Sequence, residues 1–344
     1  MSWSLDSVSF RMSGSGSWQY LLPDEASRRL YTGIYPNGAS WPKQDRQQRQ
    51  LLASWQKAAI VRSDGQKAVP LGPLMTDHDL DILKPWFRDI SDAMCAAVQE
   101  RLPEYQTLAM RLAGRTSGAR QEVENILTIQ ICAHTLDSGV FSLLRQELIG
   151  TYPPRDFAGN FFFWGYAFAF GPKRIFGFTT YGIRRRIRLH VIRSHGLDRE
   201  PLKLLLRRSE TLDYLLDLGP GERAGQEEAS ARSGKIVDSL RKAGILEPND
   251  PPRLAIPVFT DREMEPAVKL YEAVSSQVVS RFMARMDELK GLVSRCSFAR
   301  CSWPDTLCML FHLAYSYATD QLVEKGTIPE FPGSAGGEWG VWMH

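Results

Sequence analysis

The sequence predicts a mainly α-helical α+β protein made of two similar halves. Long stretches such as 76–102 and 122–148 carry apolar residues at helical spacing, and short β-prone runs lie between them. Short segments of the first half also recur, in the same order, in the second half. A chain of 344 residues with 43% hydrophobic content is long and apolar enough to bury two cores.

The internal repeat sets the predicted domain boundaries. Four of its matched pairs are Lys57–Val61 with Lys242–Leu246, Val69–Leu71 with Ile256–Val258, Thr76–Leu80 with Thr260–Met264, and Gly150–Pro153 with Gly326–Pro329. The first three pairs are offset by 184 to 187 residues and the last by 176. Such order indicates a diverged tandem duplication, which has to be recognised before a fold is assigned. The predicted parts are an N-terminal arm (1–20), a first repeat (21–170), a basic β connection (171–201) and a second repeat (202–344).

The stretch 235–260 displays the repeated unit most clearly. Apolar residues at helical spacing occupy 236–245, and Gly244 stands where a helix C-cap glycine is expected. Pro248–Pro252 is a turn that cannot be helical. Leu254–Phe259 is a short β-prone run, and Thr260 then opens the next helix.

This succession of helix, polar turn and strand resembles the recognition helix and wing of the winged-helix DNA-binding superfamily of the MarR type. The first half repeats it with a helix at Gln44–Ala59 and a tighter hairpin turn at Asp64-Gly65. The resemblance covers about 25 residues and is at the level of fold. It implies tandem winged-helix-like heads, followed by long helices of the kind that provide dimerisation or ligand-pocket elements in such regulators.

The resemblance also implies a function and a set of contacts. A winged helix inserts its recognition helix in the major groove, where polar and cationic side chains meet base edges and phosphates. The chain is then a DNA-binding transcriptional regulator whose partner is double-stranded DNA. The candidate contacts are Arg46, Gln47, Arg49, Gln50, Arg62 and Lys67 in the first head and Arg232, Ser233, Lys235, Ser239, Lys242 and Arg253 in the second. Exposed helix faces can also be simply polar, and some winged helices serve protein contacts alone.

A basic band follows the first repeat. Residues 173–208 contain eleven lysines and arginines against Asp198 and Glu200, although the whole chain has a net charge of only +3. Such a band suits a polyanion, and Arg184, Arg185 and Arg186 are its densest part. The same arginines can instead form a solvated face or protect a sheet edge from unwanted pairing.

Three β-prone runs, Asn160–Phe170, Ile175–Thr180 and Ile187–Ile192, predict a β-meander that joins the two repeats. The first run is strongly aromatic. Its side chains offer a wall for a small aromatic or anionic effector, and the candidate ligand contacts are Phe161, Phe163, Trp164, Tyr166 and Phe168. The alternative function is therefore a small-molecule binding protein or enzyme that uses these central strands. An aromatic strand can equally be part of a core.

The usual catalytic signatures do not occur in the sequence: there is no H-E-x-x-H, no nucleophile elbow and no paired C-x-x-C motif. We therefore expect a binding protein rather than an enzyme, with no catalytic residue and no cofactor. Cys296, Cys301, Cys308 and His312 could hold a metal, and the last two share a helix face. Their spacing is not specific to a metal site, and buried thiols also behave as small apolar residues.

The sequence predicts a soluble cytoplasmic protein that does not bind membranes. The N-terminus has neither a basic region nor a long apolar region of the kind a secretory signal needs. The most apolar run, Phe161–Phe170, is too short to span a bilayer as a helix. Five cysteines without a regular framework fit a reducing compartment.

Overall fold

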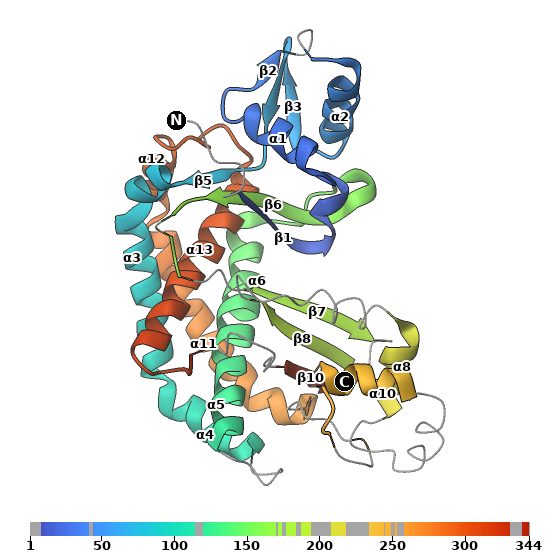
Figure 1. The fold of residues 1–344 in the computed structure, drawn as a ribbon. Coiled ribbons are helices and arrows are strands. Elements are labelled where there is room, and N and C mark those ends of the chain that lie inside the picture. The colour runs from blue at the N-terminus through green and yellow to red at the C-terminus, as the bar shows by residue number, and fades with distance from the viewer. Residues whose placement is uncertain are drawn as a thin grey trace. The chain divides into compact units, whose positions relative to one another are not determined.

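The computed structural model describes residues 8–40, 44–113, 120–169, 171–173, 177–183, 187–193, 208–217, 234–243, 245–248, 252, 258–330 and 339–343. The chain forms two compact units. The first comprises residues 1–91, 142–173 and 279–314, and the second comprises 92–141, 174–278 and 315–344. As expected from the sequence, the fold is mainly helical with small β-sheets, an α+β protein (Figure 1).

The first unit contains a small subdomain, here called the first head. Its elements are α1 (Glu25–Gly33), β2 (Ala39–Ser40), α2 (Arg46–Lys57), β3 (Val61–Asp64) and β4 (Lys67–Pro70). The strands form an antiparallel sheet in the order β2-β4-β3. Gly65 turns the hairpin between β3 and β4 with φ +60°, a backbone conformation that glycine adopts at little cost. The helix and hairpin predicted at 44–71 are confirmed.

A second sheet of the first unit has the order β1-β6-β5. The edge strand β1 (Ser9–Gly16) pairs antiparallel with β6 (Gly159–Ala167), and β5 (Leu74–Thr76) pairs parallel with it on the other side. The predicted N-terminal arm is thus an edge strand. Short 3-10 turns, η2 (Trp18–Tyr20) and η6 (Asp156–Ala158), follow β1 and precede β6.

Helices follow β5 in the chain. They are α3 (Asp77–Glu100), α4 (Leu102–Ala113) and a helical run made of α5 (Arg120–Thr128), η4 (Ile129–Val140), α6 (Phe141–Leu144) and η5 (Arg145–Ile149). The sequence predicts the end of α3 near Pro103 but not α4. Pro103 lies in the first turn of α4, where the missing N–H costs nothing because the first amides of a helix have no partner within it. Pro103 therefore allows α4 to begin directly after α3 ends.

The second unit contains a four-stranded sheet in the order β7-β8-β10-β9. Its strands are β7 (Gly177–Ile183), β8 (Ile187–Arg193), β9 (Val258–Thr260) and β10 (Trp339–Met343). Among the described residues, the remaining helices are α8 (Ser209–Asp217), α10 (Gly234–Lys242), α11 (Asp261–Ala284), α12 (Met286–Val293) and α13 (Trp303–Glu324).

The β1-β6-β5 sheet and the β7-β8-β10-β9 sheet share one arrangement of strands. In each, a central strand pairs antiparallel with one neighbour and parallel with a short strand: β6 lies between β1 and β5, and β10 lies between β8 and β9. A helix of 24 residues follows each short strand, α3 after β5 and α11 after β9. The first turns of α3 and α11 are capped in the same way. Asp79 and Glu263 each accept hydrogen bonds from the backbone N–H and the hydroxyl of the threonine three residues earlier.

The predicted β-meander is wrong. β6 does not pair with β7; it lies in the sheet of the first unit, while β7 and β8 pair with each other in the second. The physical reason is that β1 and β5 already occupy both edges of β6. Strand propensity identifies all three strands but cannot identify their partners.

One apolar cluster of the first unit lies between the first head and β6. Phe163 stacks on Phe10 with ring centroids 5.6 Å apart and meets Tyr31 edge-on, and Tyr31 meets Trp55 edge-on. All four rings are buried, so the aromatic strand and the head share one apolar cluster. Large aromatic side chains dominate core energetics because each buries a large area.

One helical stretch in the described part of the chain, Glu122–Ile149, is long and apolar enough to cross a membrane. Of the most apolar part of this stretch, 72% is buried inside the protein, which is typical of a core helix in a soluble protein.

Candidate nucleic-acid interface

Helix α2 is fixed on its buried side and capped at its start. Asp45 accepts a hydrogen bond from the Gln48 backbone N–H at 2.8 Å, and the Gln48 side chain accepts one from the Asp45 N–H, forming a capping box. Leu52 and Trp55 are fully buried, and the Trp55 indole N–H donates to the Leu21 carbonyl at 2.7 Å. The opposite side of α2 is therefore presented on a rigid support.

That opposite side carries the predicted DNA contacts. All six candidates of the first head are exposed: Arg46, Gln47, Arg49 and Gln50 on α2, and Arg62 and Lys67 on the hairpin. Residues 45–67 contain five basic and two acidic side chains. The four helix residues lie in the N-terminal half of α2, toward the positive end of the helix dipole, which attracts anions. Gln and Arg also match the hydrogen-bonding edges of adenine and guanine.

The second head is described in part. Helix α10 buries Val237 and Leu240 and exposes Lys235 and Lys242. Ser239 is half-buried, and its hydroxyl donates to the Lys235 carbonyl at 2.7 Å, so its proton is committed to its own helix. The candidates Arg184, Arg185, Arg186, Arg232, Ser233 and Arg253 lie outside the described residues.

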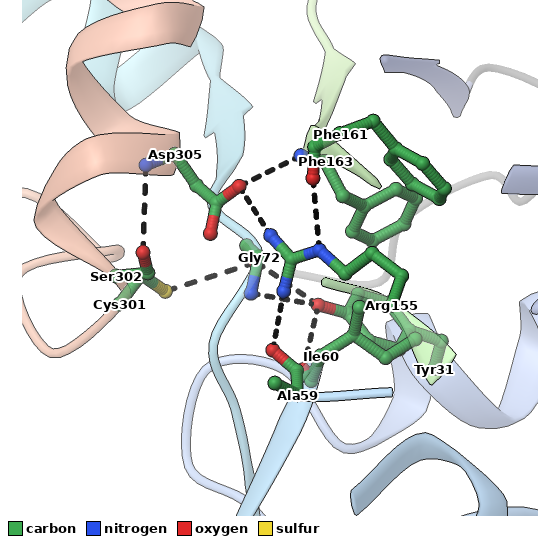
Figure 2. A network of polar contacts seen from close by, with 10 residues as sticks. All are labelled: Tyr31, Ala59, Ile60, Gly72, Arg155, Phe161, Phe163, Cys301, Ser302 and Asp305. Atoms are coloured by element: carbon green, nitrogen blue, oxygen red, sulfur yellow. Dashed lines mark hydrogen bonds and ion pairs between the residues drawn. The ribbon is translucent and has the colours of Figure 1, made fainter. Parts of the chain in front are cut away.

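A buried ion pair joins the end of α2 to β6 and to the start of α13 (Figure 2). The Arg155 guanidinium donates to three acceptors: the Ala59 carbonyl at 2.6 Å, the Phe161 carbonyl at 3.0 Å and Asp305 Oδ1 at 2.6 Å. The same Asp305 oxygen accepts the Phe163 backbone N–H at 2.7 Å. Both charged side chains are at most 2% exposed, so these hydrogen bonds replace the water that the charges lose.

Ala59 lies just beyond the C-terminal end of α2. Its φ of +52° is uncommon for a residue with a side chain. Its carbonyl is the acceptor of the Arg155 bond, and the next residue, Ile60, donates its N–H back to the Trp55 carbonyl at 3.0 Å. The direction of α2 relative to β6 is thus set by hydrogen bonds as well as by apolar packing.

Hydrogen bonds from Tyr31 also fix the linker between β4 and β5. The Tyr31 hydroxyl donates to the Gly72 carbonyl and accepts the Gly72 N–H, both at 3.1 Å. Burial raises the pKa of Tyr31 well above its usual value, so it remains a donor. A Cβ at Gly72 would lie 2.5 Å from the Phe163 ring, which only glycine avoids. Ser302 N–H donates to the Leu71 carbonyl at 2.8 Å, joining this linker to the segment before α13.

Sequence reasoning missed the Arg155–Asp305 pair. Asp305 follows Trp303-Pro304 at the start of α13, where an acidic residue is ordinary, and Arg155 lies in a Pro-Pro-Arg-Asp loop. Each looks like a surface residue by itself. Because 150 residues separate the two, no local pattern could have indicated that they meet in the core.

The aromatic side chains of β6 are occupied in packing. Phe161, Phe163, Trp164 and Tyr166 are at most 5% exposed. Trp164 lies with its ring centroid 5.8 Å from that of His312 on α13, and the half-buried Phe168 stacks on Tyr166 at 4.8 Å. These contacts are those of a core strand. Effector binding by these aromatic residues remains a prediction.

The cysteine and histidine candidates do not converge. Cys308 Sγ lies 3.6 Å from His312 Nδ1, whereas Cys296 donates to the Leu292 carbonyl and Cys301 lies 3.8 Å from the Pro70 and Gly72 carbonyls. Burial raises the pKa of Cys296 and of Cys301 to about 12, so both stay protonated. Within the described part of the chain, no three His, Cys, Asp or Glu side chains are placed to hold a metal ion together.

His312 makes the stability of the fold sensitive to acid. Burial lowers its pKa from 6.5 to about 4, and its Nδ1–H donates to the Cys308 carbonyl at 2.7 Å. Between these pH values the unfolded chain binds a proton at His312 and the folded chain does not, so the free energy of unfolding falls as the pH falls.

We expect His312→Gln to reduce this pH dependence by up to about 1.4 kcal/mol per pH unit. The measurement is urea unfolding at pH 7.5 and at pH 5. Exposed His78 provides the matched control, because His78→Gln removes an imidazole that is not buried. An unchanged slope in His312→Gln would show that the buried imidazole does not remain neutral.

Comparisons of this chain with family models, with curated proteins and with solved structures found no match.

Proposed function

We propose that the chain is a DNA-binding transcriptional regulator that reads double-stranded DNA with two diverged heads. Its first head would use α2 and the β3–β4 hairpin, and its second head would use α10. The observation that carries the proposal is the exposed face of α2: two arginines and two glutamines lie side by side in the first two turns of a capped helix, and a hairpin with two further exposed cations follows. A helix followed by a wing is the arrangement that the winged-helix resemblance implies.

The physical chemistry of this face suits duplex DNA. An α-helix fits the major groove, and arginine and glutamine are the side chains that bind guanine and adenine edges with two hydrogen bonds. Cations on the hairpin would meet phosphates, which supply most of the affinity without reading sequence. Rigid support favours such readout because little conformational entropy is then lost on binding.

The shared sheet arrangement and shared helix caps support two copies of one ancestral unit. Each copy would contribute one head, so a single chain would do what a homodimer of one-headed subunits does. We place the protein in the cytoplasm: all five cysteines are free thiols, and four of them are buried, as a reducing compartment allows.

The small-molecule alternative has less support. The β6 aromatic side chains proposed to bind an effector are buried against Phe10, Tyr31 and His312 rather than arranged along an open wall. A ligand-responsive regulator would need its effector site elsewhere, or a rearrangement of this core.

Arg46→Ala/Arg49→Ala tests the first head. Both side chains are exposed, so the fold should persist. We expect the affinity for a bound duplex to fall at least about 30-fold, from about 1 kcal/mol or more per arginine. Fluorescence anisotropy with a labelled duplex measures it.

Arg29→Ala is the matched control. It removes one positive charge, against two in the double variant, from α1 of the same head, outside α2 and the hairpin, where Arg29 pairs with Glu25. Its affinity should stay within about twofold of wild type, the change expected from one distant, screened charge. Equal losses in the control and the double variant would reject α2 as the DNA contact.

A further inference from the structure

We infer that the DNA target contains two half-sites of different sequence, one read by α2 and the other by α10. The inference rests on the proposed function and adds the class of DNA that the protein recognises. It follows from two observations: the helices are built alike on their buried sides, and they differ on their exposed sides.

The buried sides of α2 and α10 correspond residue by residue at an offset of 185. Leu52 and Trp55 correspond to Val237 and Leu240, and all four are buried. The helix ends have the same hydrogen bonds. The Ala58 N–H donates to the Ser54 backbone carbonyl and the Ala243 N–H donates to the Ser239 backbone carbonyl, both at 3.0 Å. Just beyond each helix, the Ile60 N–H donates to the Trp55 carbonyl at 3.0 Å, and the Ile245 N–H donates to the Leu240 carbonyl at 2.9 Å. Equivalent positions therefore point to equivalent sides of the two helices.

The exposed sides do not correspond chemically. Gln50 occupies the position of Lys235, and Ala53 occupies the position of Asp238; all four are exposed. Glutamine suits adenine, and the alanine methyl suits the methyl group of thymine. Lysine suits guanine, and aspartate accepts a hydrogen bond from the amino group of cytosine. A half-site whose adenine and thymine match α2 thus lacks the guanine and cytosine that suit Lys235 and Asp238 on α10.

Asp238 gives the largest difference. A carboxylate in a major groove is repelled by phosphates and by the acceptor atoms of most base edges, and only donors such as the cytosine amino group compensate it. Ala53 at the same place in the first head has no such requirement. Two identical half-sites would therefore leave one head poorly matched, at about 5- to 150-fold in affinity for each unsuitable base pair.

The test is selection of binding sites from random duplex DNA by the full chain and by two exchange variants. Gln50→Lys/Ala53→Asp gives the first head the second head's residues, and Lys235→Gln/Asp238→Ala does the reverse. We expect wild type to select a bipartite site with unlike halves. The first variant should alter base preference in one half only, and the second variant in the other half only.

The outcomes separate the two proposals. If wild type selects identical halves, or if both variants alter the same half, unlike half-sites are rejected while DNA binding stands. If wild type enriches no sequence and binds no duplex at low salt, the proposed function itself is rejected. Thermal melting of each variant confirms that the exchanged surfaces did not unfold the heads.

Discussion

Asp305→Ala is expected to lower the free energy of unfolding by about 3–5 kcal/mol. The substitution leaves the Arg155 guanidinium, only 2% exposed, without its counter-charge, and it leaves the Phe163 backbone N–H without an acceptor. Each orphaned group carries its own desolvation cost. Urea unfolding, followed by tryptophan fluorescence, measures the loss.

Two comparisons identify the cause. Arg29→Ala breaks an exposed ion pair with Glu25 and should cost less than about 1 kcal/mol. Arg155→Met/Asp305→Leu removes both buried charges together and should recover much of the stability lost in Asp305→Ala, because no uncompensated charge remains. A cost below about 1 kcal/mol for Asp305→Ala would mean that the pair is not buried as described.

The second large effect is expected at the start of α3. Asp79 is fully buried, and its carboxylate accepts four hydrogen bonds, two from Thr76 and two from Ser297. Asp79→Ala removes the helix cap and leaves four donors without partners. We expect a loss of about 2–4 kcal/mol in the free energy of unfolding.

Glu263→Ala is the matched control for Asp79→Ala. Glu263 caps α11 in the same way, but it is half-buried, and its Oε2 accepts both hydrogen bonds from Thr260. A loss of about 1 kcal/mol is expected there, the usual contribution of a cap. If the two variants lost equal stability, the Ser297 bonds to Asp79 would contribute nothing.

Elements defined by local pattern were predictable from the sequence. The α2 helix and the Asp64-Gly65 hairpin each depend on residues a few positions apart, and each is present. Exposure of the six first-head candidates followed from the amphipathic pattern of α2 and from the polar hairpin.

Features that depend on distant partners were not predictable. The antiparallel sheet partner of β6 comes from the N-terminal arm, about 150 residues away in the chain, so strand propensity misplaced β6 in a meander. The same holds for Arg155 and Asp305. A side-chain hydrogen bond within a helix was also not predicted. The spacing of Ser239 suits a base contact, but its hydroxyl donates to the carbonyl four residues earlier in the same helix.

The central claim is that α2 contacts the phosphates and bases of duplex DNA, and the salt dependence of binding tests it most directly. The measurement is the slope of log affinity against log salt concentration for wild type and for Arg46→Ala/Arg49→Ala on one duplex. Each phosphate contact contributes about 0.9 to the magnitude of the slope, so it should be smaller by up to about 1.8 in the variant. An unchanged slope together with an unchanged affinity in the variant would contradict the assignment of α2 as the DNA-binding helix, because an arginine that binds only a guanine edge lowers the affinity without changing the slope.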